Sequence, residues 1–186
     1  MAIQSSVKSG QLLLAEPFMI DPHFRRTAVL LCEHDQEGSL GLILNKPTGL
    51  SITDVIAEFP KFEAPVFYGG PVHGDSLHFI HDVGDLLEDS LQIADGVCWG
   101  GDFDTLKFLI ASELLTPERI RFFVGCAGWS GGQLEEELKY GSWIAVPMDA
   151  NYAFRSEPNE LWSQALSNKG NRFEIIAEIP EYVSWN

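Results

Sequence analysis

The chain has 186 residues, 45% of them hydrophobic and 11% aromatic, which is enough for one packed domain and excludes a disordered chain. Its 27 acidic and 12 basic residues give a formal net charge of −15, and the stretch 62–106 contains no lysine or arginine. Binding duplex nucleic acid requires several phosphates to be neutralised by bases, so direct nucleic-acid binding is disfavoured. We interpret the charge as a solvated acidic surface.

The cysteines and the apolar runs argue for a reduced, cytosolic protein. Cys32, Cys98 and Cys126 are too widely spaced for a CxxC pair or a disulfide framework. No apolar run approaches the ~20 residues of a membrane-spanning helix, and the N-terminus lacks the pattern of a secretory signal. We expect one domain over residues 1–186, located in the cytoplasm and without a membrane partner.

Strand patterns begin the chain. Residues 10–20 (GQLLLAEPFMI) predict a first strand. Apolar, β-branched-rich runs at 26–32 and 40–45 flank a polar turn and predict a hairpin. A turn centred between the two runs pairs Leu31 with Leu42.

A short helix and a second hairpin are expected next. Residues 51–59 predict a helix that is capped by Ser51, with Asp54 in capping-box spacing. Segments 65–70 and 77–82 surround a turn-like sequence and predict two paired strands.

Strands and helices alternate in the second half. Residues 90–101 predict one strand, which ends at Asp102, the expected N-cap of an amphipathic helix over 103–115. The pattern then predicts a buried strand at 120–127, a helix after the Gly-rich turn, a strand at 142–147, a helix at 156–168 that is capped by Ser156, and a strand or short helix at 172–180. These elements predict an α+β or layered α/β fold, with a mixed, largely antiparallel β-sheet and flanking helices.

The segment 124–138 (VGCAGWSGGQLEEEL) has two interpretations. A strand, a Gly-rich turn and a helix can bind phosphate on the N-terminal amides of the helix. A P-loop, however, has lysine and serine or threonine after its last glycine, whereas Gly132 is followed by Gln133, leucine and three glutamates, which repel anions. Ser130 and Gln133 have capping-box spacing, which favours a plain helix start.

Cysteine and histidine give no clear site. Cys126 lies before the expected helix and has no neighbouring base, so it is interpreted as a core residue unless folding brings a histidine to it. His73, His78 and His81 are interleaved with aspartates, but His78 and His81 fall on opposite faces of the expected strand. We interpret the three as surface histidines, with no metal site and no cofactor indicated.

A basic cluster is the best candidate for an anion site. The first hairpin brings Asn45 and Lys46, at its open end, near Arg25 and Arg26, the only adjacent pair of bases in the chain. His34 falls at the turn end, about 20 Å from Asn45 at ~3.3 Å per residue. The alternative is that these bases pair with local acids.

The chain resembles a known family. DPHFRRTAVLLCEHDQEGSLGLILNKP, YGGPV and GCAGWSGGQLEEEL, followed by SWIAVP, occur in this order in the YqgE/AlgH family of bacterial proteins, and the similarity runs from about residue 10 to the last helix. The resemblance implies a compact α/β fold, a cytosolic protein and the family label of transcriptional regulator, but no catalytic or ligand-binding residues. The matching positions are Asp21, Pro22, Arg26, Glu33, His34, Gly41, Asn45, Lys46, Gly69, Gly70, Pro71, Gly125, Trp129, Gly132, Gln133, Leu134, Glu135 and Glu137. The chain departs from the family at CWGGDFD, where many members carry a Ser/Thr-rich strand.

Two hypotheses about function follow. The first is a non-catalytic regulatory or binding module, acting through a protein partner or a small anionic ligand. The second is an anion- or nucleotide-binding sensor or enzyme whose site lies near the basic cluster and the Gly-rich loops. The candidate ligand-binding residues are Arg25, Arg26, Asn45, Lys46, Gly69, Gly70, Gly132 and Gln133. No catalytic residue is indicated.

Overall fold

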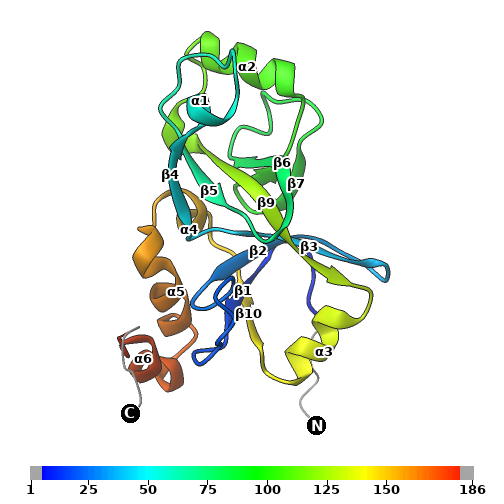
Figure 1. The fold of residues 1–186 in the computed structure, drawn as a ribbon, viewed down its shortest axis with the longest axis vertical. Helices are drawn as coiled ribbons and strands as arrows, with labels where there is room; N and C mark the ends of the chain where they lie inside the picture. The colour runs from blue at the N-terminus through cyan, green and yellow to red at the C-terminus, as the bar shows by residue number, and fades with distance from the viewer. Residues whose placement is uncertain (1–5, 181–186) are drawn as a thin grey trace.

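The computed structural model describes residues 6–180, which fold around a curled sheet of ten strands with helices packed on it (Figure 1). All strand pairs except one are antiparallel. The expected α+β fold with a mixed, largely antiparallel sheet is therefore confirmed.

The elements follow the chain in this order. The strands are β1 (Gln11–Ala15), β2 (Ala28–His34), β3 (Gly38–Ile43), β4 (Pro47–Ser51), β5 (Pro65–Tyr68), β6 (Val72–His81), β7 (Leu91–Ala94), β8 (Val97–Trp99), β9 (Ile120–Ser130) and β10 (Trp143–Pro147). The helices are α1 (Ile52–Val55), α2 (Phe103–Ala111), a 3-10 turn (Pro117–Arg119), α3 (Gln133–Lys139), α4 (Ala150–Phe154), α5 (Pro158–Ser167) and α6 (Asn171–Ala177).

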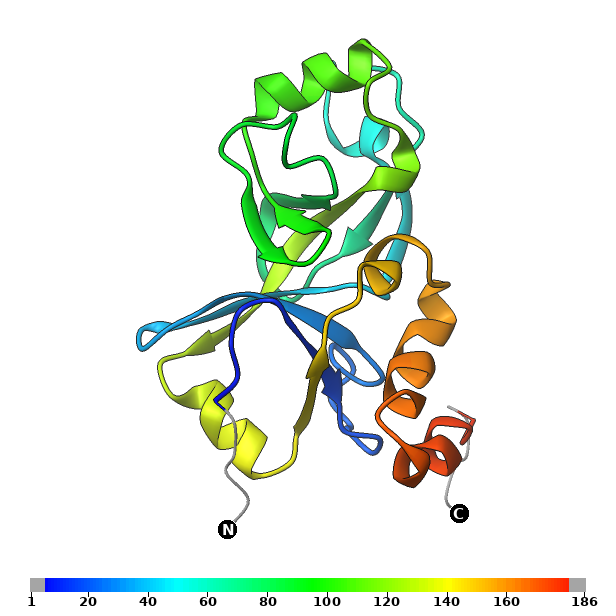
Figure 2. The same ribbon diagram turned by 180° about the vertical axis from the view of Figure 1, so that it is seen from behind.

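Strand β9 connects the two halves of the molecule. The strand order is β10-β1-β2-β3-β9-β6-β8-β7, and β4 joins through β5, which pairs in parallel with β9. The end of β9 pairs with β3, whereas its beginning lies between β5 and β6. Figures 1 and 2 show β9 running from the half that carries α1 and α2 into the half that carries α3 and α5.

Strand alternation creates opposite apolar faces on the sheet around β1. Even-numbered β1 residues such as Leu12 and Leu14 join the cluster that contains Trp162 of α5. Odd-numbered residues such as Leu13 join the cluster that contains Leu134 of α3. Because successive side chains point to opposite faces of a strand, α5 and α3 cover opposite faces of the same strands. A third cluster lies under α2.

The first hairpin is confirmed, but its expected register is wrong by one residue along most of its length. Leu30, not Leu31, faces Leu42, and the pairing shifts between Leu31 and Glu33. A β-bulge adds one residue to one strand only, so the register inferred from the turn holds only up to the bulge. His34 at the turn end faces Ser39, as the turn position predicts.

The prediction of a second hairpin is wrong. The strands β5 and β6 exist, but they do not pair with each other, because β9 is hydrogen-bonded between them. The segment expected to be one strand at 90–101 is instead the hairpin β7–β8, with Ala94 facing Val97 across an Asp-Gly turn. Asp-Gly is a strong two-residue turn signal.

Local capping signals locate two helices well. Ser51 N donates to Asp54 Oδ2 at 2.9 Å before α1, and Thr105 N donates to Asp102 Oδ1 at 2.7 Å at the start of α2. The expected caps at Ser130 and Ser156 are displaced, because Gly132 and Glu157 occupy the N-cap positions of α3 and α5. Segment 172–180 forms α6, and α4 was not expected.

Among the helices of residues 6–180, none is both long and apolar enough to cross a membrane.

Candidate functional site

Asn45 holds the turn that carries the basic cluster. Its Oδ1 accepts a hydrogen bond from Ala28 N at 3.0 Å, and its Nδ2 donates to Arg26 O at 2.9 Å. The second bond supports Arg26 in a left-handed backbone conformation (φ 53°), which residues other than glycine rarely adopt. The Asn45 side chain, not its backbone, thus makes the bond to Ala28. Both the oxygen and the nitrogen of its side-chain amide are hydrogen-bonded to the backbone.

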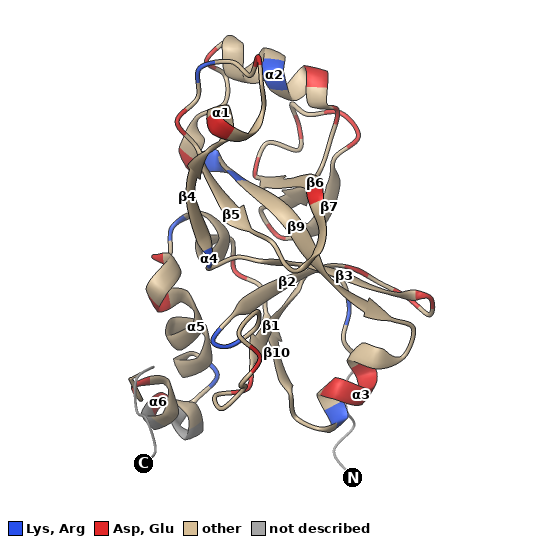
Figure 3. Cartoon of the chain, viewed as in Figure 1, with Lys and Arg blue, Asp and Glu red and all other residues tan. Residues whose placement is uncertain are grey.

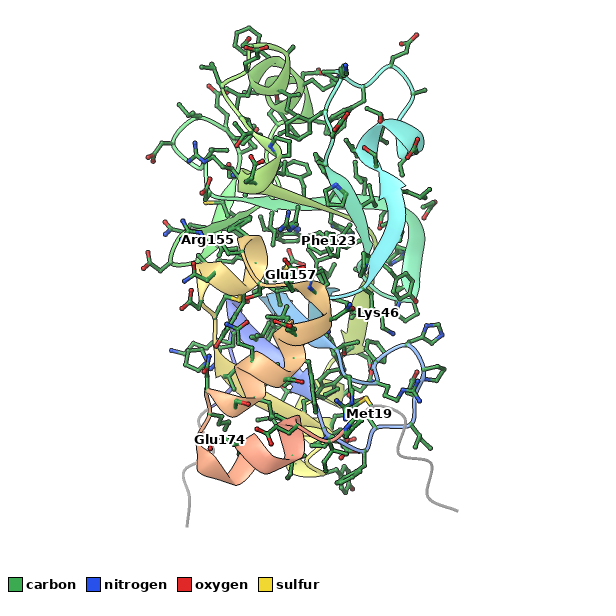
Figure 4. All side chains as sticks on the ribbon, turned by 90° about the vertical axis from the view of Figure 1, so that its left-hand side faces the viewer. Met19, Lys46, Phe123, Arg155, Glu157 and Glu174 are labelled. Atoms are coloured by element: carbon green, nitrogen blue, oxygen red, sulfur yellow. The ribbon has the colours of Figure 1, made fainter. Side chains whose placement is uncertain are left out.

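Lys46 ties the same loop to the neighbouring strands. Its Nζ donates to Pro22 O at 2.8 Å and to His23 O at 2.6 Å. Its backbone O accepts from Tyr68 N at 2.7 Å, and Tyr68 Oη lies 2.9 Å from His23 Nδ1. Figure 4 shows Lys46 above the loop that carries Met19. The structure therefore brings Lys46 beside the GGP segment, with two of its ammonium donors directed at backbone carbonyls.

Arg26 is directed toward the C-terminal region of the chain. Its guanidinium donates to Ile179 O and lies over the ring of Trp162, with Cζ 4.7 Å from the ring centroid. Arg25 lies exposed on the same turn. A guanidinium that bonds a carbonyl and stacks on an indole fastens the 21–27 loop to α5 and to the segment after α6.

Gly69 and Gly70 allow two backbones to approach closely. A Cβ at Gly69 would collide with Gly125 O, and a Cβ at Gly70 would collide with the backbone of Cys126. Gly70 also has φ +152°. These glycines are required where the end of β5 packs against β9.

Gly132 and Gln133 lie at the other end of β3. Strand pairing places Gly38 opposite Ser130, so the turn before α3 sits against the tip of the β2–β3 hairpin. Seven residues of extended chain separate Gly38 from Asn45, about 23 Å at ~3.3 Å per residue. Gln133 nevertheless lines one cavity with Asp21 and Phe24, which precede Arg25 in the 21–27 loop, whereas Arg25, Arg26, Asn45 and Lys46 are not among the residues that line it. The prediction that the basic cluster and the GQLE segment form one anion site stays a prediction. The side-chain donors of Arg26 and Lys46 are directed at backbone carbonyls, which does not favour it.

The opening of α3 has a structural explanation. Glu137 Oε2 accepts hydrogen bonds from the indole nitrogens of Trp129 at 2.9 Å and Trp143 at 2.7 Å, and Gln133 Nε2 donates to Glu137 Oε1 at 2.8 Å. Gln133 Oε1 in turn accepts from Ser130 N at 3.0 Å. We name this group the Glu137 clamp. It joins β9, α3 and β10, so the Gly-rich motif builds a helix start and a fixed carboxylate.

The cysteines are embedded in the fold. Cys32 and Cys126 are 1% and 2% exposed, and burial raises the pKa of both thiols. Burial also raises the pKa of Cys98, which is partly exposed. A raised pKa keeps each group as the thiol near neutral pH, whereas the thiolate is the nucleophile.

The interpretation of His81 as a surface residue is wrong. His81 is fully buried; its Nε2 lies 2.8 Å from Gly100 O and its Nδ1 accepts from Val83 N at 3.2 Å. These partners fit a neutral ring with the proton on Nε2, and burial lowers the pKa. His78 is half-buried and stacks on Trp99. In residues 6–180, no group of three or more His, Cys, Asp or Glu side chains is arranged to hold a metal.

A cavity beside α3 and β10 brings together residues that sequence reasoning left apart. It measures about 490 Å³ and we name it the α3–β10 cavity. Its lining residues are Ser6, Val7, His34, Glu135, Leu138, Lys139, Trp143, Ile144, Ala145, Lys169 and Phe173. Its lysines come from α3 and from the turn after α5, and its apolar lining comes from β10, α3, α6 and Val7, which precedes β1.

The polar groups of this cavity are held in place. His34 Nδ1 lies 2.7 Å from Ser39 Oγ, and His34 Nε2 lies 3.4 Å from Glu135 Oε1. The His34 side chain is 12% exposed, whereas that of Glu135 is 46% exposed. Lys169 Nζ donates to Ala145 O at 2.8 Å. A histidine with a partner on each nitrogen and a lysine anchored by one bond form a fixed polar rim.

One signal for this cavity was readable in the sequence. Glu135, Leu138 and Lys139 lie at i, i+3 and i+4 and therefore share one face of α3. Lys169 and Phe173 lie at least 30 residues farther along the chain and carry no motif. Only the packing of α5 and α6 beside β10 brings them to that face.

A family model described as AlgH-like matches residues 12–174. The chain belongs to the AlgH-like family. A UPF0301 protein of Chlorobium limicola is 41% identical over 180 residues, which are 97% of this chain and 96% of that protein. A UPF0301 protein of Cytophaga hutchinsonii is 40% identical over 172 residues, which are 92% and 94% of the two chains.

Solved structures agree with this assignment. The solution structure of the AlgH protein from Pseudomonas aeruginosa aligns with a TM-score of 0.74 at 30% identity, covering 96% of this chain and 98% of that one. A crystal structure of a protein from Corynebacterium diphtheriae aligns with a TM-score of 0.78 at 20% identity, covering 94% and 93%. The second likeness shows the fold alone. The resemblance read from the sequence is confirmed.

In this AlgH-like chain, several positions that carry the resemblance have tasks in the fold. Asn45 and Lys46 hold the 21–27 loop, Gly70 lets β5 approach β9, and Glu137 joins two tryptophans. These motif residues therefore have structural roles in the AlgH-like fold. The α3–β10 cavity, to which His34 and Glu135 contribute, is the candidate site that the geometry favours.

Proposed function

We propose that this AlgH-like protein is a binding module whose α3–β10 cavity takes a small acidic molecule with an apolar body. The observation that carries the proposal is one cavity of about 490 Å³ with cationic groups on its rim and aromatic and aliphatic side chains on its floor. Ligand pockets in proteins are typically about 300–1,000 Å³, mostly apolar, with a few placed polar groups. The cavity fits that description in size and in composition.

The charges of the rim favour an acid. Lys139 and Lys169 line the cavity together with His34, in a chain whose formal net charge is −15. Glu135 is the acidic lining residue, and it contacts His34. An ammonium has three N–H donors, and one of those of Lys169 is directed at Ala145 O, so others can reach a ligand. Lysine recognises carboxylate and phosphate as a point charge, so the shared chemistry is a small anion.

The floor of the cavity favours an apolar body on that anion. Val7, Leu138, Trp143, Ile144 and Phe173 supply aliphatic and aromatic surface. Apolar contact contributes roughly 25 cal/mol for each Å² removed from water, whereas a fully hydrated small ion gains nothing from it. We therefore expect an aromatic or branched-chain acid to bind more tightly than inorganic phosphate.

A regulatory role fits this proposal without direct contact to duplex DNA. Figure 3 shows acidic residues on α3, on α2 and on the loops near α2, with the basic residues scattered. A surface of this kind repels a polyanion, so any effect on transcription is expected to pass through the bound ligand or a protein partner. Three free cysteines support the cytoplasm as the place of action.

The test is a thermal-shift and calorimetric screen at low salt. The panel contains aromatic carboxylates, branched-chain carboxylates, sugar phosphates, nucleotides and a duplex DNA. The variant pair Lys139→Met/Lys169→Met removes both ammoniums and keeps chain length. Lys107→Met is the matched control, because Lys107 lies on α2 and pairs with Asp104 at 3.0 Å. A ligand at 100 times its Kd stabilises the fold by about 2.7 kcal/mol.

The outcomes separate the hypotheses. Binding of an acid that the double lysine variant loses and Lys107→Met retains supports the proposal. Binding that instead disappears in Arg26→Ala/Lys46→Ala places the ligand at the basic cluster and refutes the α3–β10 cavity. Selective, salt-dependent binding of the duplex, or no binding of any acid, also refutes the proposal.

A further inference from the structure

We infer that the loop after β1 presents a docking surface for a partner segment that carries an apolar anchor flanked by lysine or arginine. The surface consists of residues 16–21 and the cavity behind them, and we name it the 16–21 surface. Ile20 is 92% exposed and Phe18 is 62% exposed. Neighbouring large apolar side chains in water mark interaction surfaces more often than single ones do. The inference concerns a different cavity from that of the proposed function.

The exposed side chains are carried by a fixed loop. Glu16 N donates to Ser142 O at 2.9 Å, Phe18 N donates to Glu16 Oε2 at 3.0 Å, and Met19 N donates to Glu16 O at 3.1 Å. Lys46 fastens the following turn through its two bonds to backbone carbonyls. A surface that is already ordered loses little entropy when a partner binds.

A cavity of about 560 Å³ lies directly behind these side chains. Phe24, Trp129 and Trp143 contribute aromatic surface to it, and the rings of Phe24 and Trp143 meet edge to face with centroids 5.5 Å apart. The Glu137 clamp fixes both indoles. An aliphatic or aromatic anchor from a partner therefore finds rigid aromatic walls, with Phe18 and Ile20 at the entrance.

The charged residues that line this cavity are all acidic. Glu16, Asp21 and Glu137 line it, and no lysine, arginine or histidine of the described residues does so. Glu16 Oε2 and Asp21 Oδ1 each accept a backbone N–H of the loop, which leaves the other oxygen of each carboxylate to face a partner. Arg25 follows in the chain but is outside the lining. Complementarity therefore selects a basic flank, and the net charge of −15 steers such a segment toward the protein.

The experiment uses the full chain and three labelled synthetic hexapeptides. The first has an isoleucine-phenylalanine centre between two pairs of lysines. The second replaces the lysines with glutamates, and the third replaces the apolar centre with glycine and serine. Fluorescence polarisation at low and at physiological salt gives the Kd, and the indole N–H signals of Trp129 and Trp143 in NMR spectra locate the binding.

The variants are Ile20→Ser, Phe18→Ser and Asp21→Asn, with Leu114→Ser as control. Leu114 is 54% exposed and lies just beyond α2. We expect the lysine peptide to bind and to shift both indole signals, with Kd weakened at least fivefold by Ile20→Ser or Phe18→Ser and unchanged by Leu114→Ser. Asp21→Asn should reduce the salt dependence of Kd.

Three results would overturn the inference. Equal binding of the glutamate peptide removes the charge argument. A Kd that is unchanged by Ile20→Ser and Phe18→Ser, or no binding at millimolar peptide, shows that the 16–21 surface is not the docking site. Self-association of the free chain in sedimentation that Ile20→Ser abolishes assigns the surface to a second copy of this chain instead of a basic partner.

Discussion

The Glu137 clamp gives the most specific prediction about stability. Glu137→Ala removes the carboxylate that accepts both indole N–H groups and the amide of Gln133. Trp129 and Trp143 are 6% and 4% exposed, so their donors have little access to replacement water. An unsatisfied buried donor costs its full desolvation penalty, which makes this loss larger than that of a surface hydrogen bond.

The magnitude follows from the bonds. A hydrogen bond to a charged group contributes about 1.5–3 kcal/mol, and three such bonds are lost, two of them from buried indoles. Because Gln133 is exposed and Glu137 is half-buried, water compensates for part of this loss. We expect a loss of roughly 3 kcal/mol in the free energy of unfolding. For a chain of this size, that loss lowers Tm by roughly 6–12 °C. Glu137→Gln retains one acceptor oxygen and should lose about 1 kcal/mol.

Urea unfolding followed by tryptophan fluorescence measures these differences. Glu136→Ala is the control, because Glu136 lies on the same helix with an exposed side chain. It should change the unfolding free energy by less than about 0.5 kcal/mol. If Glu137→Ala costs no more than Glu136→Ala, the clamp does not hold the fold and the reasoning is refuted.

Three further predictions use the same unfolding assay. Gly70→Ala should cost at least about 3 kcal/mol, because its Cβ would collide with the backbone of Cys126 and because φ is +152°. Gly74→Ala is the control and should cost under about 1 kcal/mol, since no atom lies within 4 Å of the added Cβ. Equal costs would contradict the close approach of β5 to β9. Lys46→Met should cost roughly 0.5–1.5 kcal/mol, because two exposed carbonyls of the 21–27 loop exchange an ammonium donor for water, and a neutral outcome would show that the loop does not depend on it. Burial lowers the pKa of His81, whereas the histidine of the unfolded chain keeps the ordinary pKa of 6.5, so the unfolded chain binds more protons. The free energy of unfolding should therefore be at its full value above pH 6.5. It should fall as the pH drops toward the folded pKa, by up to about 1.4 kcal/mol per pH unit. His81→Gln should flatten that slope, and an unchanged slope would exclude His81 as its source.

Short-range patterns predicted much of the fold. The first hairpin, the capped starts of α1 and α2 and the strand β10 all depend on turn residues, caps and alternation within a few positions. Such signals act through bonds between near neighbours, so they are readable without knowing the rest of the chain. The motif at 124–138 is also correctly predicted as a helix start, although the glycine that caps it could not be told from its neighbours.

Tertiary structure decided which segments meet. Two strands that look like a hairpin are separated because β9, some 50 residues later, pairs with both, and a bulge near Cys32 moves the register that the turn implies. The burial of His81 and the cavity that joins His34, Lys139 and Lys169 arise in the same way. The sequence alone determined the local elements, the acidic charge and the family resemblance, because these are properties of adjacent or summed residues. The position of the cavity depends on contacts between segments that are distant in the sequence. These contacts form only when the whole sheet is packed, so they cannot be read from local patterns.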